Sequence, residues 1–198
     1  VATKEFQKKP KIKLFYKKTD QTHIALGVRS YNIWDYRRFA LSVLATILGG
    51  GMSSRLFNVL RDKLGIAYYV RTGGNETTDA GNLETSAGVN NKRAEEAIKA
   101  ILMEYKKIKT EKVSLEELNK AKEHMEGSLI LGIETSDELA SFFGFQEILK
   151  NEIMRPDEVI KKIQAVTAND VLEVAQDIFK SEKLNLAMIG PFKDKKPF

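Results

Sequence analysis

The chain has 198 residues, of which 42% are hydrophobic and 30% are charged, proportions typical of a soluble globular protein with a sizeable core. The absence of cysteine excludes disulfides and thiolate metal sites and is compatible with a cytoplasmic location, which we expect. The net charge of +5 is spread along the chain, without the basic face of a nucleic-acid-binding protein, and no apolar run approaches the roughly 20 residues of a membrane helix.

The first predicted elements are two strands followed by two helices. Apolar residues alternate over residues 11–17 and again over residues 22–29, which is the period of a strand. From Ala40 to Leu48 they recur at helical spacing, and the glycines that follow end this helix. A second helix is predicted from Ser53 to about Lys63, with Ser53 or Ser54 as its N-cap.

A hairpin comes next, because two strand patterns, residues 66–72 and 82–89, flank a stretch rich in turn residues, 73–81. An apolar stripe from Ala94 to Tyr105 then predicts the first of about five helices. Capping boxes or a first-turn proline mark the starts of the others: Ser114 with Glu117, Thr135 with Glu138, Pro156, and Thr167 with Asp170. Alternation over residues 184–188 predicts a closing strand.

This order of elements predicts an α+β fold, a two-layer sandwich in which a mainly antiparallel sheet packs against helices. No linker, repeat or low-complexity tract lies between Lys17 and Pro191, so residues 1–198 are expected to form a single domain. The first residue, Val1, is not methionine, which indicates a piece of a longer protein. Phe142 and Phe143 fit a helical stripe and are predicted to pack in the core, whereas Phe145 is a candidate interface residue.

One segment, from Leu48 to Tyr68, carries a specific resemblance and reads LGGGMSSRLFNVLRDKLGIAY. A helix that ends in glycines is followed by a helix of the type S-R-L-x-x-x-L-R and by a strand that begins with G-x-A-Y. These three pieces resemble the C-terminal half-domain of the family of pitrilysin, insulin-degrading enzyme and mitochondrial processing peptidase. The order of strands and helices resembles that half-domain from about Lys11 to Phe192.

The resemblance implies a role in proteolysis. In that family two similarly folded half-domains face each other, and the first binds zinc through an H-x-x-E-H motif and a downstream glutamate. This chain would then be the metal-free, substrate-binding half of a zinc metalloendopeptidase and inactive alone. Its partners would be a peptide and the zinc-bearing half-domain, placed upstream on the same chain or on a separate subunit. No cofactor is expected in this chain.

Arg61 and Tyr68 are the candidate substrate-binding residues. The turn between the second helix and the following strand can bring both side chains to one rim, where a guanidinium and a phenol suit the carbonyl groups of an extended peptide. Taken alone, an arginine in a last helical turn or a tyrosine in a strand has an ordinary structural explanation. The resemblance favours function, because the matching residues of the family contact substrate carbonyls near the scissile bond.

The glycines and histidines are predicted to be structural. Gly49, Gly50 and Gly51 follow a helix and lack the lysine of a phosphate-binding loop, so they indicate a sharp turn between helices. His23 and His124 do not form an H-x-x-E-H motif, since lysine occupies the first histidine position of the stretch that ends at His124. We therefore expect neither a metal site nor a catalytic residue in this chain.

A second function remains open, that of a non-catalytic structural or processing subunit of the same family. Retention of Arg61 and Tyr68 favours the peptidase, because a purely structural copy has no need of the pair. An unrelated nucleic-acid-binding protein is disfavoured by the scattered charge and by the absence of a recognisable reading motif.

Overall fold

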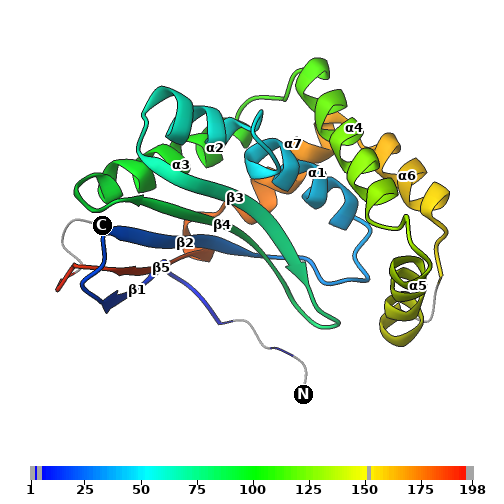
Figure 1. The fold of residues 1–198 in the computed structure, drawn as a ribbon, viewed down its shortest axis with the longest axis horizontal. Coiled ribbons are helices and arrows are strands. Elements are labelled where there is room, and N and C mark those ends of the chain that lie inside the picture. The colour runs from blue at the N-terminus through cyan, green and yellow to red at the C-terminus, as the bar shows by residue number, and fades with distance from the viewer. Residues whose placement is uncertain (1–2, 4–5, 151–152, 195–198) are drawn as a thin grey trace.

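The computed structural model describes residue 3, residues 6–150 and residues 153–194. Its strands are β1 (Lys11–Tyr16), β2 (Gln21–Ser30), β3 (Ala67–Glu76), β4 (Gly81–Asn90) and β5 (Leu184–Gly190). They form one five-stranded sheet of order β1-β5-β2-β4-β3 (Figure 1). β1 and β5 are parallel, and the other neighbours are antiparallel, so the prediction of a mainly antiparallel sheet is confirmed.

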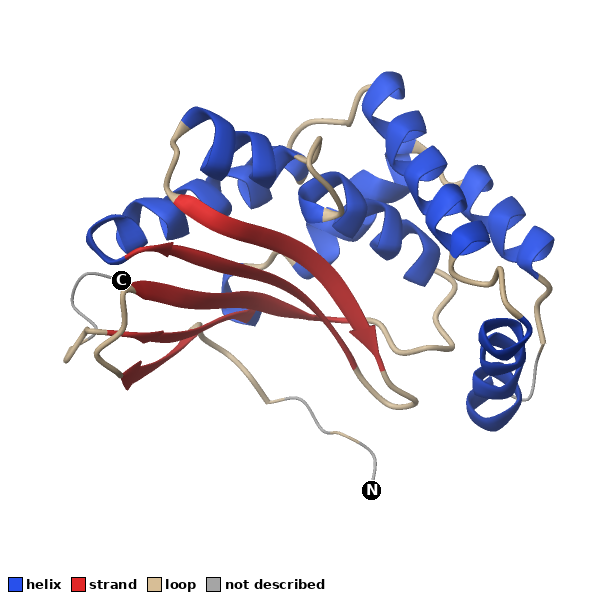
Figure 2. Ribbon diagram, viewed as in Figure 1, coloured by secondary structure: helices blue, strands red, loops and turns tan. Residues whose placement is uncertain are grey.

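The helices of the described part of the chain lie on one face of this sheet (Figure 2). They are α1 (Arg38–Gly49), α2 (Arg55–Phe57), α3 (Ala94–Ile108), α4 (Leu115–Leu131), α5 (Ser136–Lys150), α6 (Pro156–Ala165) and α7 (Ala168–Ile178). A π-helix over Asn58–Lys63 continues α2 without a break, and short 3₁₀ turns precede α3 and β5. The arrangement is the predicted α+β sandwich. Among the described helices, none combines the length and the apolar character needed to cross a bilayer.

The core lies between the sheet and α1. Ile24, Leu26 and Val28 alternate along β2 toward the helices and are at most 3% exposed, as the period of two predicts. Leu44 and Leu48 of α1 belong to the same core and are fully buried. Burial of these side chains, worth roughly 2 kcal/mol each, holds the helical layer against the sheet.

The helix α5 stands apart from the other helices at one end of the molecule (Figure 1). Phe142 and Phe143 are half-buried and contact each other edge to face, with ring centroids 5.3 Å apart, outside the main core. The prediction that they belong to the core is therefore wrong. Phe145 and Ile148 are 67% and 80% exposed, which leaves an apolar surface on this helix.

Three local predictions need correction. Gly73 and Gly74 belong to β3 rather than to the hairpin turn, because they pair with Glu84 and Leu83 of β4 and this pairing outweighs their turn propensity. Neither predicted serine caps α2: Ser54 occupies the N-cap position but makes no capping hydrogen bond.

The third correction concerns the start of α4. The Ser114 hydroxyl does accept a hydrogen bond from the Glu117 N–H, as the capping box requires. The Glu117 carboxylate, however, does not return to the helix start, because Arg55 of α2 donates two hydrogen bonds to it, 2.6 and 2.7 Å long. This pair, which raises the pKa of Arg55, ties α2 to α4.

A carboxylate near the end of α7 connects the segment between β2 and α1 with the segment that follows α7. Asp177 accepts hydrogen bonds from the Tyr31 hydroxyl (2.9 Å), from Arg37 (3.2 Å) and from Lys180 (3.1 Å). Burial opposes the charge of Asp177, but these hydrogen bonds and the nearby lysines lower its pKa below the ordinary value. The charged form of Asp177 therefore stabilises the fold.

Replacing Asp177 with Asn is expected to lower the free energy of unfolding at pH 7 by about 1 kcal/mol, after allowance for solvent screening at this partly exposed site. The lowered pKa of Asp177 stabilises the fold fully above the unfolded pKa of about 3.9, and this contribution is lost as the pH falls through the lower pKa of the folded state. The difference in stability from the wild type should therefore shrink below about pH 4. Urea denaturation at pH 7 and pH 3.5 measures this. The exposed Asp20→Asn variant should match the wild type, and a pH-independent deficit in Asp177→Asn would contradict the assignment.

Candidate functional site

The two predicted binding residues meet at the start of β3. The Arg61 guanidinium donates a hydrogen bond from Nη1 to the backbone carbonyl of Tyr68, with an N···O distance of 3.1 Å. Arg61 also lies over the ring of Phe57, with its guanidinium carbon 5.2 Å from the ring centroid. Both Arg61 and Tyr68 are exposed, so their remaining hydrogen-bond donors face solvent.

The chain conformation before β3 explains why Arg61 points outward. Leu60 is fully buried and anchors the π-helical segment, which turns its neighbour Arg61 to the surface. The turn closes with a hydrogen bond from the Ile66 N–H to the Leu60 carbonyl, 2.9 Å long. Gly65 within this turn has a φ of 61°, a left-handed conformation that glycine adopts at little cost. A π-helical turn is often found at functional sites.

A β-bulge sets the direction of Tyr68. Ala67 lies opposite Val89 and Tyr69 opposite Gly88, so Tyr68 is the extra residue of β3 and has no partner in the ladder. Its side chain is 59% exposed. Tyr68 is therefore presented at the rim of the sheet, where its phenol can donate a hydrogen bond to another molecule.

Tyr69, which was not predicted as a site residue, follows Tyr68 in β3 and reaches toward β2. Its hydroxyl lies 3.0 Å from Nδ1 of His23 on β2. Gly88 lies below the ring, and a Cβ at that position would come within 2.3 Å of it. The sequence could have indicated Tyr69 as a surface residue, because Tyr69 and Arg71 are two residues apart in a predicted strand and such residues share a face.

A cavity of about 460 Å³ lies beside the Arg61 side chain. The glycine turn of residues 49–51 forms one wall, and Met52 and Phe57 add apolar surface. Arg61 and Arg71 both line it. Two arginines and an apolar surface thus line one cavity, which suits a ligand that carries both hydrogen-bond acceptors and apolar groups.

The glycine turn is held by close packing. Gly49 lies against β3 so tightly that a Cβ would come within 2.4 Å of the backbone nitrogen of Thr72. The ring nitrogen Nε2 of His124 lies 3.0 Å from the Gly50 carbonyl and connects the turn to α4. Gly51 has more room, with no atom closer than 3.7 Å to an added Cβ.

The described residues contain no group of three or more His, Cys, Asp or Glu side chains that is arranged to hold a metal ion. His23 and His124 lie on different elements, β2 and α4, and each has a hydrogen-bonding neighbour in the protein. The residues present therefore do not fit zinc.

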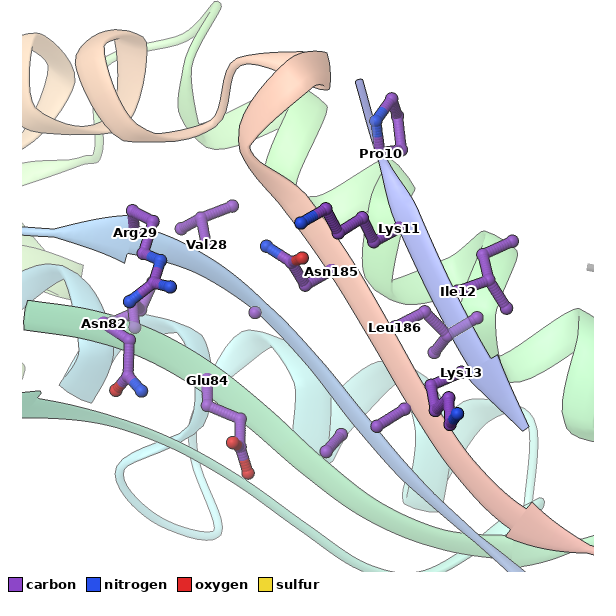
Figure 3. Close-up of a pocket in the computed structure, with 14 residues that line it drawn as sticks. Pro10, Lys11, Ile12, Lys13, Val28, Arg29, Asn82, Glu84, Asn185 and Leu186 are labelled. Carbon is purple, nitrogen blue, oxygen red and sulfur yellow. The ribbon is translucent and has the colours of Figure 1, made fainter. Parts of the chain in front are cut away.

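A larger hollow of about 710 Å³ lies on the face of the sheet opposite the helices. Figure 3 shows Lys11 and Lys13 of β1 on one side of it and Glu84 of β4 on the other. It exists because Ala25 and Gly27 of β2 leave the middle of the sheet without large side chains. Neither predicted binding residue lines this hollow, so it is separate from the cavity beside Arg61.

Comparison with known proteins identifies the family of the chain. The model of the "Peptidase M16 inactive domain" family matches residues 1–125. An uncharacterized zinc protease of Streptomyces coelicolor is 35% identical over 93% of this chain, and one of Bacillus subtilis is 33% identical over 88%. The matches cover 40% and 42% of those two proteins, so the chain spans less than half the length of the curated relatives that it matches.

Solved structures share the fold. A protease from Helicobacter pylori has a TM-score of 0.86 at 24% identity, with 93% of this chain and 45% of that chain covered. A peptidase M16 inactive domain from Pseudomonas fluorescens also has a TM-score of 0.86, at 20% identity, with 98% and 47% covered. In both cases the chain corresponds to about half of the longer molecule.

Proposed function

The chain belongs to the family of M16 peptidase inactive domains, and on this basis we propose that it is the substrate-binding half of a zinc metalloendopeptidase. The names of its curated relatives support a zinc protease as the whole protein. In this proposal the chain positions an extended peptide and contributes no metal ligand and no catalytic residue. Alone it does not cleave peptides.

The observation that carries the proposal is the placement of Arg61 next to Tyr68. One guanidinium N–H holds the Tyr68 carbonyl at 3.1 Å, which fixes the side chain while its other donors remain available. Together with the exposed phenol, they would hold the carbonyl oxygens of a peptide and stabilise negative charge that develops on the attacked carbonyl. Such donors bind a peptide backbone without selecting its sequence.

The proposed partner is a zinc-bearing half-domain, upstream on the same chain or on a separate subunit. Two surfaces support a facing partner. The sheet face opposite the helices carries the hollow near Lys11 and Lys13, and α5 exposes Phe145 and Ile148. The partner would supply the zinc, whose chemistry is the activation of water for hydrolysis. We further propose a cytoplasmic location and no role in binding nucleic acid or membranes.

A reconstitution experiment tests this function. The chain is mixed with a zinc-bearing half-domain that contains H-x-x-E-H and is encoded in the same genome, and cleavage of an internally quenched peptide is followed. We expect turnover in the mixture, none by either half alone, and loss of turnover when a zinc chelator is added. Zinc-dependent cleavage by this chain alone would refute the proposal. An inactive mixture of well-folded, associated halves would favour the structural subunit instead.

A further inference from the structure

Arg71 is a cation in the candidate site that the proposed function does not use. It lies on β3, an edge strand of the described sheet, opposite Ser86 of β4. Its side chain is exposed and makes no hydrogen bond, ion pair or ring contact with any residue that the structure describes. It nevertheless lines the cavity of about 460 Å³ together with Arg61.

The charge of this cavity is unbalanced. Arg61 and Arg71 are the two charged residues that line it, and arginine remains charged at every physiological pH. The described residues that line the cavity include no Asp or Glu. Two like charges that share a hollow repel each other, and a bound anion relieves that repulsion.

Glu84 is the acidic residue of β4 that lies closest to Arg71 in the pairing of β3 with β4, and its carboxylate accepts a hydrogen bond from another residue. Glu84 lies opposite Gly73, two residue pairs beyond the Arg71 and Ser86 pair. Its carboxylate accepts a hydrogen bond of 2.6 Å from the Ser86 hydroxyl. Glu84 also lines the separate hollow on the open sheet face rather than the cavity beside Arg61. Arg71 therefore has no acidic partner among the residues that the structure describes.

We propose that Arg71 selects peptides that place a carboxylate in this cavity, an inference that rests on the proposed peptide-binding function. A guanidinium matches a carboxylate with two parallel hydrogen bonds, and Arg61 adds a second cation on the same hollow. Met52 and Phe57 accommodate the apolar part of the same or an adjacent substrate residue. The carboxylate belongs to an Asp or Glu side chain or to the C-terminus of the peptide.

Fluorescence polarisation with three labelled octapeptides tests the inference. The first has a central Glu and an amidated C-terminus, the second has Gln in place of Glu, and the third has the Gln sequence with a free C-terminal carboxylate. Each is titrated with the wild-type chain, with Arg71→Gln, and with the control Arg155→Gln, which removes one exposed charge at the N-cap of α6.

We expect the wild type and Arg155→Gln to bind one of the two carboxylate peptides about fivefold more tightly than the amidated Gln peptide, the upper end for exposed ion pairs. The peptide that gains affinity identifies the carboxylate as side-chain or C-terminal. Arg71→Gln should remove the preference and leave binding of the neutral peptide unchanged. Raising the salt concentration to 0.5 M should also diminish the preference of the wild type for the carboxylate peptide.

Two results would overturn the inference, and they are distinguishable. Equal binding of all three peptides, unaffected by Arg71→Gln, refutes selection by Arg71 and leaves peptide binding itself standing. Absence of binding by all three peptides refutes the proposed function together with the inference.

Discussion

Substituting Arg61 with Ala is expected to lower the kcat/KM of the reconstituted peptidase about a hundredfold, the effect of removing one donor that stabilises charge in a transition state. Tyr68→Phe removes only a hydroxyl, which the structure leaves exposed on the bulge, and is expected to cost about tenfold. Initial rates of peptide cleavage at saturating zinc-bearing half measure both effects.

The control separates binding from folding. Lys63→Ala removes an exposed cation from the same π-helical segment but does not touch the cavity, and it should retain wild-type rates. Arg61 also holds the Tyr68 carbonyl, so the melting temperature of each variant is measured in parallel. Wild-type rates in folded Arg61→Ala and Tyr68→Phe would remove the basis of the proposed function.

The second large effect is expected at Gly49. A Cβ there would lie 2.4 Å from the Thr72 nitrogen and 2.5 Å from the Thr72 hydroxyl oxygen, so Gly49→Ala pushes α1 away from β3. Thr72 cannot yield easily, because it is buried and its hydroxyl lies 2.8 Å from that of Thr85. We expect the free energy of unfolding to fall by about 3 kcal/mol, the upper range for overpacking.

The neighbouring Gly51 provides a matched control. An added Cβ would have its nearest neighbours, ring atoms of His124, at 3.7 Å, which is ordinary contact. Gly51→Ala should therefore change the free energy of unfolding by less than about 0.5 kcal/mol. Urea denaturation followed by circular dichroism compares the two variants. Equal stability would mean that close packing does not explain the glycine at position 49.

Local periodicity was sufficient to predict the order of the elements. The alternation at Ile24, Leu26 and Val28 and the helical spacing through Leu44 and Leu48 each follow from one face that is buried. These patterns depend only on neighbours in the sequence, so they can be interpreted before the fold is known.

The features that were missed depend on distant partners. Glu117 does not complete its capping box because its carboxylate binds Arg55, which is 62 residues away in the sequence. Gly73 belongs to a strand because it pairs with Glu84 of β4. The bulge at Tyr68 likewise depends on the register with β4, which a single strand pattern cannot specify. That Arg61 and Arg71 line one cavity has the same origin, since they belong to two different elements.

The exposed side chains of α5 have a consequence for how such a protein is maintained in a cell. Phe145 and Ile148 present to water the kind of surface that chaperones and degradative proteases recognise. Under the proposal that a separate zinc-bearing subunit covers this helix, copies of the chain in excess of that subunit are expected to be cleared. In that arrangement the abundance of the partner would limit that of the chain.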